Sequence, residues 1–464
     1  MTARLAPLAA LLVLAAAAAA QDAPALARSE EALAARYAAL REALEAELGA
    51  PLDPPPRFVP ARRAEVARVI AAENEELLGG MEGAPAGAEL RRLAEQQGRA
   101  LSEACFGKLH LADGHVMVAG EAFERLAAVA PELAGLREAA FLDVILVHEA
   151  VHVWQDRRFG VRAFVGHPRD EEELRARFCV LEGHAQVVTR RVAERLGLGE
   201  AFALLVRANS EVPSSVTDPA LRHFLDAVTQ VTGFQYVSGE RFVAAALERL
   251  GRDAGLERLF TAPPRTLRAV SHPERYLDPP AEADLDLRAL ARAAAAHLPA
   301  RWPHQVSPVP EPALRSGLAL AGDEALTWLA EGHRETYAVN ASDPGVPGRA
   351  VTVVLIGCTS PEAAARMIDL EERVSRVKDE DFSKPGGAFV ITSSTYARPE
   401  LGDRPGLFAD KRLRTPGGEL TVRTLVVVRG AVVVEIVSVH HPDLDQAGLE
   451  ALAREVLALL PGGD

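Results

Sequence analysis

Two histidines and a glutamate interrupt the most apolar helical stretch of the chain, which reads AAFLDVILVHEAVHVW at residues 139–154. His148 and His152 are four positions apart, so on a helix their side chains lie one turn apart on the same face and can hold one ion. Burying such polar groups is costly unless a partner compensates them. The stretch therefore predicts a long buried helix that carries two metal ligands.

The remaining parts of a catalytic zinc site are also present. Zn²⁺ suits two imidazoles, a carboxylate and an open position for water. Glu149 directly follows the first histidine, where its carboxylate can reach that water and act as a base. Glu182, in VLEGHAQVV on a following helix, is the expected third ligand, and the small Gly183 beside it allows a neighbouring helix to approach closely. His184 is the alternative ligand, but it lies about 200° around the helix from Glu182, so both cannot serve.

Five motifs follow one another in order between about residues 100 and 280. They are HEAVHVWQD (148–156), LEGHA (181–185), YVSGERFV (236–243), APP (262–264) and HPERY (272–276). The first two resemble the gluzincin group of zinc metallopeptidases, the thermolysin-type clan. The full series is similar to that of exported bacterial metallopeptidase-like proteins. The resemblance implies that His148, His152 and Glu182 bind zinc and that Glu149 is the general base.

The chain departs from the family pattern at two places. Thermolysin-type gluzincins usually carry an aspartate four residues after the third ligand, where it supports the first histidine. This chain has Gln186 there, and we expect its amide oxygen to accept the same hydrogen bond. The closer relatives tend to have a Ser-Thr-Glu-Gln-like stretch before HPExY, whereas residues 265–271 read RTLRAVS, so the role of that stretch stays open.

Peptide hydrolysis by zinc also needs a hydrogen-bond donor for the oxyanion of the tetrahedral intermediate. His272 and Tyr276 are assigned to the catalytic set because they lie in a motif after the third ligand, and Tyr236 is a further candidate. Each has a structural alternative, since His and Tyr side chains often hold a proline-flanked loop in place by hydrogen bonds.

The stretch KLHLADGHVMV alternates in polarity around an Asp-Gly turn and predicts a β-hairpin at about 107–119. It contains no proline, which would remove a backbone N–H donor from the edge of the strand. In zinc peptidases resembling this chain, an extended substrate adds to a strand beside the HExxH helix, and we expect this hairpin to supply that strand. The alternative is a hairpin that only packs on the helix. His110 and His115 are expected to be surface residues.

The predicted fold class is α+β, in several regions. Residues 1–20 are expected to be a secretory signal peptide and 21–100 an N-terminal helical region. A mainly helical zincin-like metallopeptidase domain with a small antiparallel sheet follows at 101–300. A proline-rich linker is expected at 301–312, and a smaller α+β accessory domain with one antiparallel sheet at 313–464. The valine-rich runs at 350–358 and 418–439 predict strands of that sheet.

Charge and cysteine content limit the partners and the compartment. A net charge of −14 argues against nucleic acid and against an anionic membrane surface. No later segment has 18 uncharged apolar residues, so no integral membrane span is expected after signal cleavage. The three cysteines, Cys105, Cys179 and Cys358, are expected to be buried thiols, with a Cys105–Cys179 bridge as the lesser alternative. The oligomeric state stays open.

These features together predict an exported zinc metallopeptidase, periplasmic or secreted, that hydrolyses a peptide or protein substrate. The alternative is a non-catalytic, zinc-stabilised binding protein of the cell envelope. Glu149 separates the two hypotheses, because a purely structural zinc site has no need of a base beside its metal.

Overall fold

The structure is a computed structural model. It describes residues 29–81, 87–103, 105–129, 131–212, 233–278, 285–309, 311–346, 348–383, 390–415 and 418–460. The expected signal peptide at 1–20 lies outside the described residues. The chain divides into two compact units, unit 1 (Met1–Pro279) and unit 2 (Pro280–Asp464), and the candidate metal ligands belong to unit 1.

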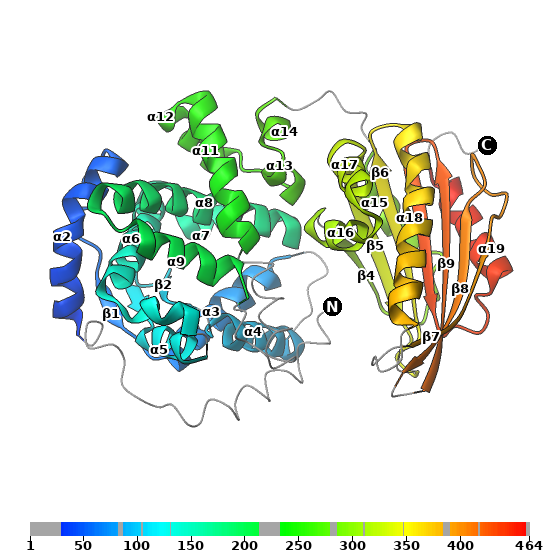
Figure 1. The fold of residues 1–464 in the computed structure, drawn as a ribbon, viewed down its shortest axis with the longest axis horizontal. Coiled ribbons are helices and arrows are strands. Elements are labelled where there is room, and N and C mark those ends of the chain that lie inside the picture. Colours follow the sequence, from blue (N-terminus) through cyan, green and yellow to red (C-terminus); the bar gives the residue numbers. More distant parts are fainter. Residues whose placement is uncertain are drawn as a thin grey trace. The chain divides into compact units, whose positions relative to one another are not determined.

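Unit 1 is mainly helical (Figure 1). Its helices are α2 (Glu30–Leu48), α3 (Arg63–Gly79), α4 (Ala88–Leu101), α5 (Gly120–Val129), η4 (Pro131–Arg137), α6 (Ala139–Phe159), α7 (Val161–Val165), α8 (Glu171–Leu196), α9 (Gly199–Ser210), η5 (Phe234–Ser238), α11 (Gly239–Leu250), α12 (Arg252–Thr261), α13 (Leu267–Ser271) and α14 (Pro273–Leu277).

The predicted buried helix is α6, and it is buried around most of its circumference. This explains why its sequence is apolar nearly throughout instead of showing one apolar stripe. The neighbouring α8 begins at Asp170, whose side chain accepts a hydrogen bond from the Glu173 N–H, and three glutamates occupy its first turn. Both features stabilise a helix N-terminus. The helix ends at Gly197, which adopts the left-handed conformation with φ 72°.

The N-terminal helices belong to the same core as α6 and α8, which differs from the separate region expected at 21–100. Leu33 and Tyr37 of α2 and Val66 of α3 are buried in one cluster with the apolar residues of α6. Arg36 of α2 also pairs with Asp143 of α6, at 2.8 Å between Nη2 and Oδ2. Residues 30–79 thus support the helix that carries the histidines.

A three-stranded sheet lies beside α6, in the order β1-β3-β2. The strands are β1 (Phe58–Pro60), β2 (Gly107–Leu109) and β3 (Val116–Val118). β2 and β3 form the predicted hairpin, with Gly107 opposite Val118, while β1 pairs with β3 in parallel. Among the described strands β2 pairs only with β3, so it is an edge strand.

Unit 2 contains a seven-stranded antiparallel sheet in the order β4-β5-β6-β10-β9-β8-β7. Its strands are β4 (His304–Pro308), β5 (His333–Ser342), β6 (Ala350–Cys358), β7 (Val390–Ala397), β8 (Leu407–Thr415), β9 (Gly418–Arg429) and β10 (Val432–Val439). Its helices are α15 (Leu287–Ala295), α16 (Glu311–Leu318), η6 (Ala319–Ala321), α17 (Asp323–Glu331), α18 (Pro361–Phe382) and α19 (Gln446–Ala458). The predicted α+β class is confirmed.

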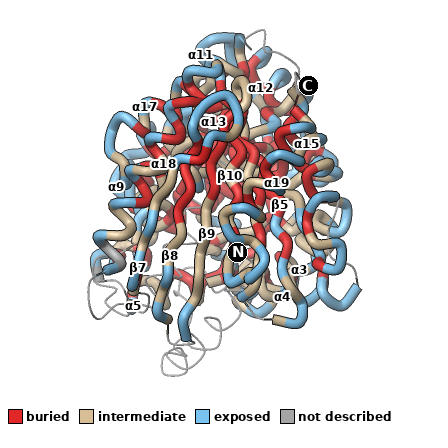
Figure 2. Tube along the Cα trace, turned by 90° about the vertical axis from the view of Figure 1, so that its right-hand side faces the viewer, coloured by how far each residue is buried: buried red, intermediate tan, exposed pale blue. Residues whose placement is uncertain are grey.

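Helices cover both faces of this sheet. Val434 of β10 belongs to a core cluster shared with α15 and α19, whereas the adjacent Val433 belongs to a cluster shared with α17 and α18. Successive side chains of a strand point to opposite faces, so a strand buried on both faces is apolar at most positions, as β10 is. Figure 2 shows the burial of the central strand β10.

The linker expected at 301–312 is instead part of unit 2. It contains β4, which pairs with β5 from His304 opposite Ala341 to Pro308 opposite Tyr337. Leu287, which lies before the expected linker, is buried in the core of the same unit. β4 is an edge strand, and edge strands are where a sheet tolerates proline. The proline-rich sequence was therefore compatible with a linker or with an edge strand.

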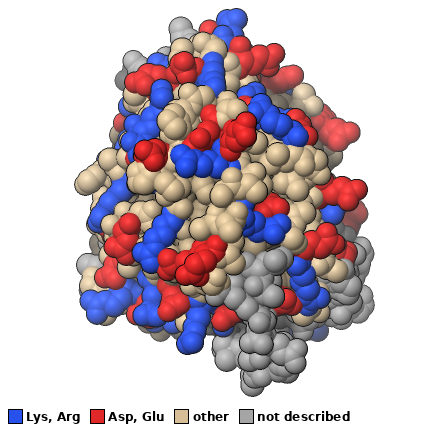
Figure 3. Space-filling view, turned by 90° about the vertical axis from the view of Figure 1, so that its left-hand side faces the viewer, with Lys and Arg blue, Asp and Glu red and all other residues tan. Residues whose placement is uncertain are grey.

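Charged side chains of both signs are interspersed on the face drawn in Figure 3, so that face presents no large field of one sign. No helix within the described ranges has the length and apolarity needed to cross a membrane. All three cysteines are free thiols.

Candidate metal centre

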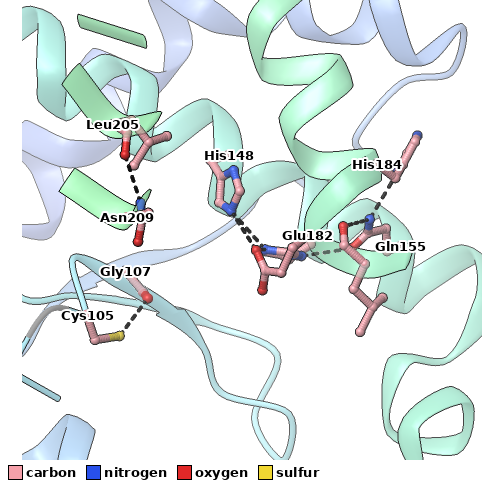
Figure 4. Close-up of polar contacts among 10 residues, drawn as sticks. Cys105, Gly107, His148, Gln155, Glu182, His184, Leu205 and Asn209 are labelled. Carbon is pink, nitrogen blue, oxygen red and sulfur yellow. Dashed lines mark hydrogen bonds and ion pairs between the residues drawn. The ribbon is translucent and has the colours of Figure 1, made fainter. Parts of the chain in front are cut away.

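Helices α6 and α8 bring three donor atoms together (Figure 4). The His148 Nε2 atom lies 3.2 Å from Glu182 Oε2 and 3.2 Å from His152 Nε2, and His152 Nε2 lies 3.4 Å from Glu182 Oε2. Ligands bound tetrahedrally at the usual zinc distances of about 2.0–2.2 Å are separated by about 3.3–3.5 Å. The three atoms therefore form a triangle of the size that one zinc ion requires.

The electrostatics of this cluster favour a cation. Burial raises the pKa of Glu182, but the two facing imidazoles outweigh it and hold this pKa well below its ordinary value. Burial lowers the pKa of His152, and the carboxylates of Glu182 and Glu149 outweigh it, raising this pKa to about 9. In the metal-free protein the carboxylates thus attract protons to the histidines, and a divalent ion satisfies the same attraction.

Glu149 lies on α6 between the two histidines and is buried. Its burial raises the pKa of its carboxyl, outweighing the opposing effect of His152 and His148. The backbone of β2 packs directly against this side chain, because a Cβ atom built at Gly107 would lie 2.5 Å from the Cγ atom of Glu149. A larger residue at this position would displace the Glu149 side chain, so the edge strand runs immediately beside the carboxylate.

Gln155, one turn beyond His152, fixes the tautomer of that ligand. Its amide nitrogen donates to the Leu181 carbonyl at 2.9 Å, so its amide oxygen must face His152 Nδ1, at 2.8 Å. A carbonyl-type oxygen only accepts, so His152 carries its proton on Nδ1 and leaves Nε2 free for a metal. The second amide hydrogen points at His184 Nδ1, at 3.0 Å (Figure 4).

His184 is therefore a support for Gln155 and takes no place in the donor triangle. Burial lowers its pKa to about 3, so its ring is neutral and its Nδ1 atom can accept the amide hydrogen. Its ring also packs on Trp154 and faces Phe260, at ring-centroid distances of 5.5 and 6.4 Å.

The hydrogen bond expected between Gln186 and His148 does not form. Within the described part of the chain, neither amide atom of Gln186 has a hydrogen-bond partner, and neither has His148 Nδ1. Gln186 is fully buried on α8. We based this expectation on the aspartate that the family carries at the same position. In this structure the hydrogen-bonding side chain is Gln155, and it holds the second histidine, His152.

We expect the substitution Gln155→Leu to weaken zinc binding by about 10–100-fold, the usual effect of losing an outer-shell partner of a metal ligand. The affinity is measured by competition with a chelator. Gln186→Leu is the matched control, since it removes an equally buried glutamine that makes no hydrogen bond in the described structure. Equal zinc affinities for the two variants would show that Gln155 does not support His152.

Gly183 permits a close helix crossing, as expected, and the neighbouring helix is α11. A Cβ atom at Gly183 would lie 2.2 Å from the Gly239 carbonyl oxygen, and one at Gly239 would lie 2.4 Å from the Cys179 carbonyl oxygen. The two glycines thus bring α8 and α11 into backbone contact. The crossing places η5, which directly precedes α11, next to the donor triangle.

Tyr236 is the η5 residue that reaches the site. Its ring stacks on the His148 ring, with centroids 5.7 Å apart and planes at 19°. Burial, followed by the charges of Glu182 and Glu149, raises the pKa of its hydroxyl well above the ordinary value. The hydroxyl is therefore protonated and is a donor at the site. η5 is a π-helix, a form frequently found at functional sites.

The other two candidate donors make contacts with other parts of unit 1. The Tyr276 hydroxyl is 2.8 Å from the Ala262 carbonyl and 3.0 Å from the Arg258 carbonyl, so its single proton is committed to holding the loop after α12. These contacts correspond to the structural alternative that the sequence left open for Tyr276. His272 lies between α13 and α14 with its Nδ1 atom 3.5 Å from Glu274.

The structure thus brings four of the six predicted site residues together, namely His148, Glu149, His152 and Glu182, and adds Tyr236, Gln155 and Gly107. Comparison of the chain with protein-family models, with curated proteins and with solved structures found no match to any of them.

Proposed function

We propose that this protein is an exported zinc-dependent metallopeptidase that hydrolyses peptide bonds. The observation that carries the proposal is the position of Glu149 beside a donor triangle of zinc dimensions, with an edge strand packed against the same carboxylate. The resemblance of the five motifs to zinc metallopeptidases supports it, and the composition of residues 1–20 supports export.

Each residue has a proposed role in the reaction. Zinc held by His148, His152 and Glu182 would supply a Lewis acid for the scissile carbonyl and lower the pKa of a bound water. Glu149 takes the proton of the attacking water and passes it to the leaving amine. The raised pKa of its carboxyl suits it to the first step, because a more basic carboxylate accepts a proton from water more readily near neutral pH.

The edge strand β2 is the proposed binding strand for the substrate backbone. The Ala119 N–H donates to the Phe106 carbonyl, and the His110 N–H donates to the His115 carbonyl. Lys108 lies midway between Phe106 and His110, so its backbone N–H and C=O also point towards β3. The backbone groups of Gly107 and Leu109 then face away from β3. Their carbonyls accept hydrogen bonds from the Cys105 thiol at 3.0 Å and the Lys108 ammonium at 2.5 Å. An extended substrate can replace these side-chain donors with its own N–H groups.

Tyr236 is the proposed donor to the oxyanion. We expect Tyr236→Phe to lower kcat by about 10²–10³-fold with little change in zinc content, because one preorganised donor is typically worth that much. The rate is measured on a peptide substrate and the zinc by elemental analysis.

Tyr276→Phe is the control for this variant. Its hydroxyl serves two loop carbonyls, so its loss should reduce stability by about 0.5–1.5 kcal/mol and leave kcat near the wild-type value. The same kcat for both phenylalanine variants would remove Tyr236 from the catalytic set.

The proposal itself is tested by incubating a mixed peptide library with protein stripped of zinc by a chelator, and with the same protein after zinc is restored. We expect products only from the restored protein. Absence of products from both samples would favour the alternative of a zinc-stabilised binding protein.

A further inference from the structure

A second group of metal-type ligands lies at the turn of the β2–β3 hairpin, outside the centre described above. His110 and His115 close the hairpin ladder, with the His110 N–H donating to the His115 carbonyl at 2.9 Å. Side chains of such a directly opposed pair extend from the same face of the ladder. The two imidazole rings accordingly face each other, with centroids 5.1 Å apart.

The turn folds a carboxylate back onto this pair. Gly114 adopts the left-handed conformation with φ 69°, and its N–H donates to the His110 carbonyl at 2.8 Å. This tight turn places Asp113 Oδ2 2.8 Å from His110 Nδ1 and 3.9 Å from His115 Nδ1. One donor atom from each of the three residues lies within 4.8 Å of the others.

We propose that His110, Asp113 and His115 bind one divalent transition-metal ion of the zinc type. Two imidazoles and one carboxylate are a ligand set for zinc and its neighbours in the transition series, whereas Ca²⁺ and Mg²⁺ prefer oxygen ligands throughout. The Asp113 side chain is 63% exposed, so it is free to shorten the longer distance and water can complete the coordination.

The surroundings are compatible with a cation at this turn. Arg57 is the cation that acts on His115, and its charge is offset by an ion pair with Glu30 at 2.8 Å. Because Arg57 is paired with Glu30, its charge does not compete with a metal ion for the Asp113 carboxylate. An ion held here would also tie the two strands together at the turn of the hairpin whose Gly107 packs against Glu149.

The inference does not depend on the proposed peptidase activity, because its test is metal stoichiometry. Chelator-stripped protein is titrated with Zn²⁺ alone, and bound zinc per chain is measured by calorimetry and elemental analysis. We expect two zinc ions for the wild type, one for the double variant His110→Ala/His115→Ala, and one for His152→Ala. A double variant that binds as many zinc ions as the wild type would overturn the inference.

Two further variants separate ligand loss from misfolding. Asp113→Asn keeps a residue suited to the turn but removes the charge. Loss of an outer-shell partner lowers metal affinity by roughly 10–100-fold, and we expect loss of this ligand charge to lower the affinity for the second zinc ion by at least as much. His297→Ala removes a histidine that faces only the single carboxylate of Glu455, at 2.9 Å, and should retain both ions. Loss of an ion in His297→Ala, or unchanged binding in Asp113→Asn, would count against the site. Displacement of the second zinc by equimolar Ca²⁺ would contradict the proposed ligand chemistry.

Discussion

Replacement of Glu149 by glutamine is expected to lower kcat for peptide hydrolysis by about 10²–10⁴-fold while zinc remains bound. Glutamine keeps the shape that packs against Gly107, so the fold and the three donor atoms stay in place. What disappears is the ability to accept a proton from the attacking water and return it to the leaving amine. The rate is measured on a peptide substrate, and zinc content is measured on the same samples.

The matched control for this variant is Glu248→Gln, the same chemical change at an exposed position of α11. It should retain wild-type kcat. If Glu149→Gln also retained wild-type kcat, Glu149 would not be the general base, and the proposed mechanism would be wrong even if zinc were bound.

The second large effect is expected from Glu182→Gln. An amide oxygen is a much poorer zinc ligand than a carboxylate, so the donor triangle loses its only anionic member. We expect zinc at this centre to be lost at concentrations that saturate the wild type, and hydrolysis to be lost with it. Zinc occupancy is measured by chelator competition.

The same variant should lose the stabilisation that this zinc provides. An ion present at 100 times its Kd stabilises the folded state by about 2.7 kcal/mol. For a unit of this size, that corresponds to a Tm difference on the order of 5–10 °C. Calorimetry of the wild type and the variant, each with and without zinc, gives this difference. Unchanged zinc binding and an unchanged zinc-dependent Tm would exclude Glu182 as a ligand.

The local periodicity of the chain was sufficient to predict several elements. Four-residue spacing on a helix places His148 and His152 on one face whatever the rest of the fold does. Glu149 directly follows the first of these histidines in the sequence. The Asp-Gly turn likewise predicted the β2–β3 hairpin, and the valine runs predicted β6, β9 and β10. The β2–β3 and β9–β10 pairings join residues that are close in sequence, whereas β6 was predicted from its valine-rich run although it pairs with the distant β10.

Long-range packing decided what the sequence left open. The crossing of Gly183 with Gly239 brings Tyr236 to the metal ligands, while the Tyr276 hydroxyl is held by backbone carbonyls at the end of α12. Both tyrosines lie in motifs of similar appearance, and no spacing rule distinguishes them.

Gln155 presents the same contrast. Its position one turn after His152 is visible in the sequence, but its role depends on the Leu181 carbonyl of α8, which fixes the direction of its amide. The sequence by itself therefore pointed to His148, His152 and Glu182 as candidate metal ligands. The tertiary structure decided which residues orient and assist them, because those contacts join helices whose separation in sequence carries no periodic signal.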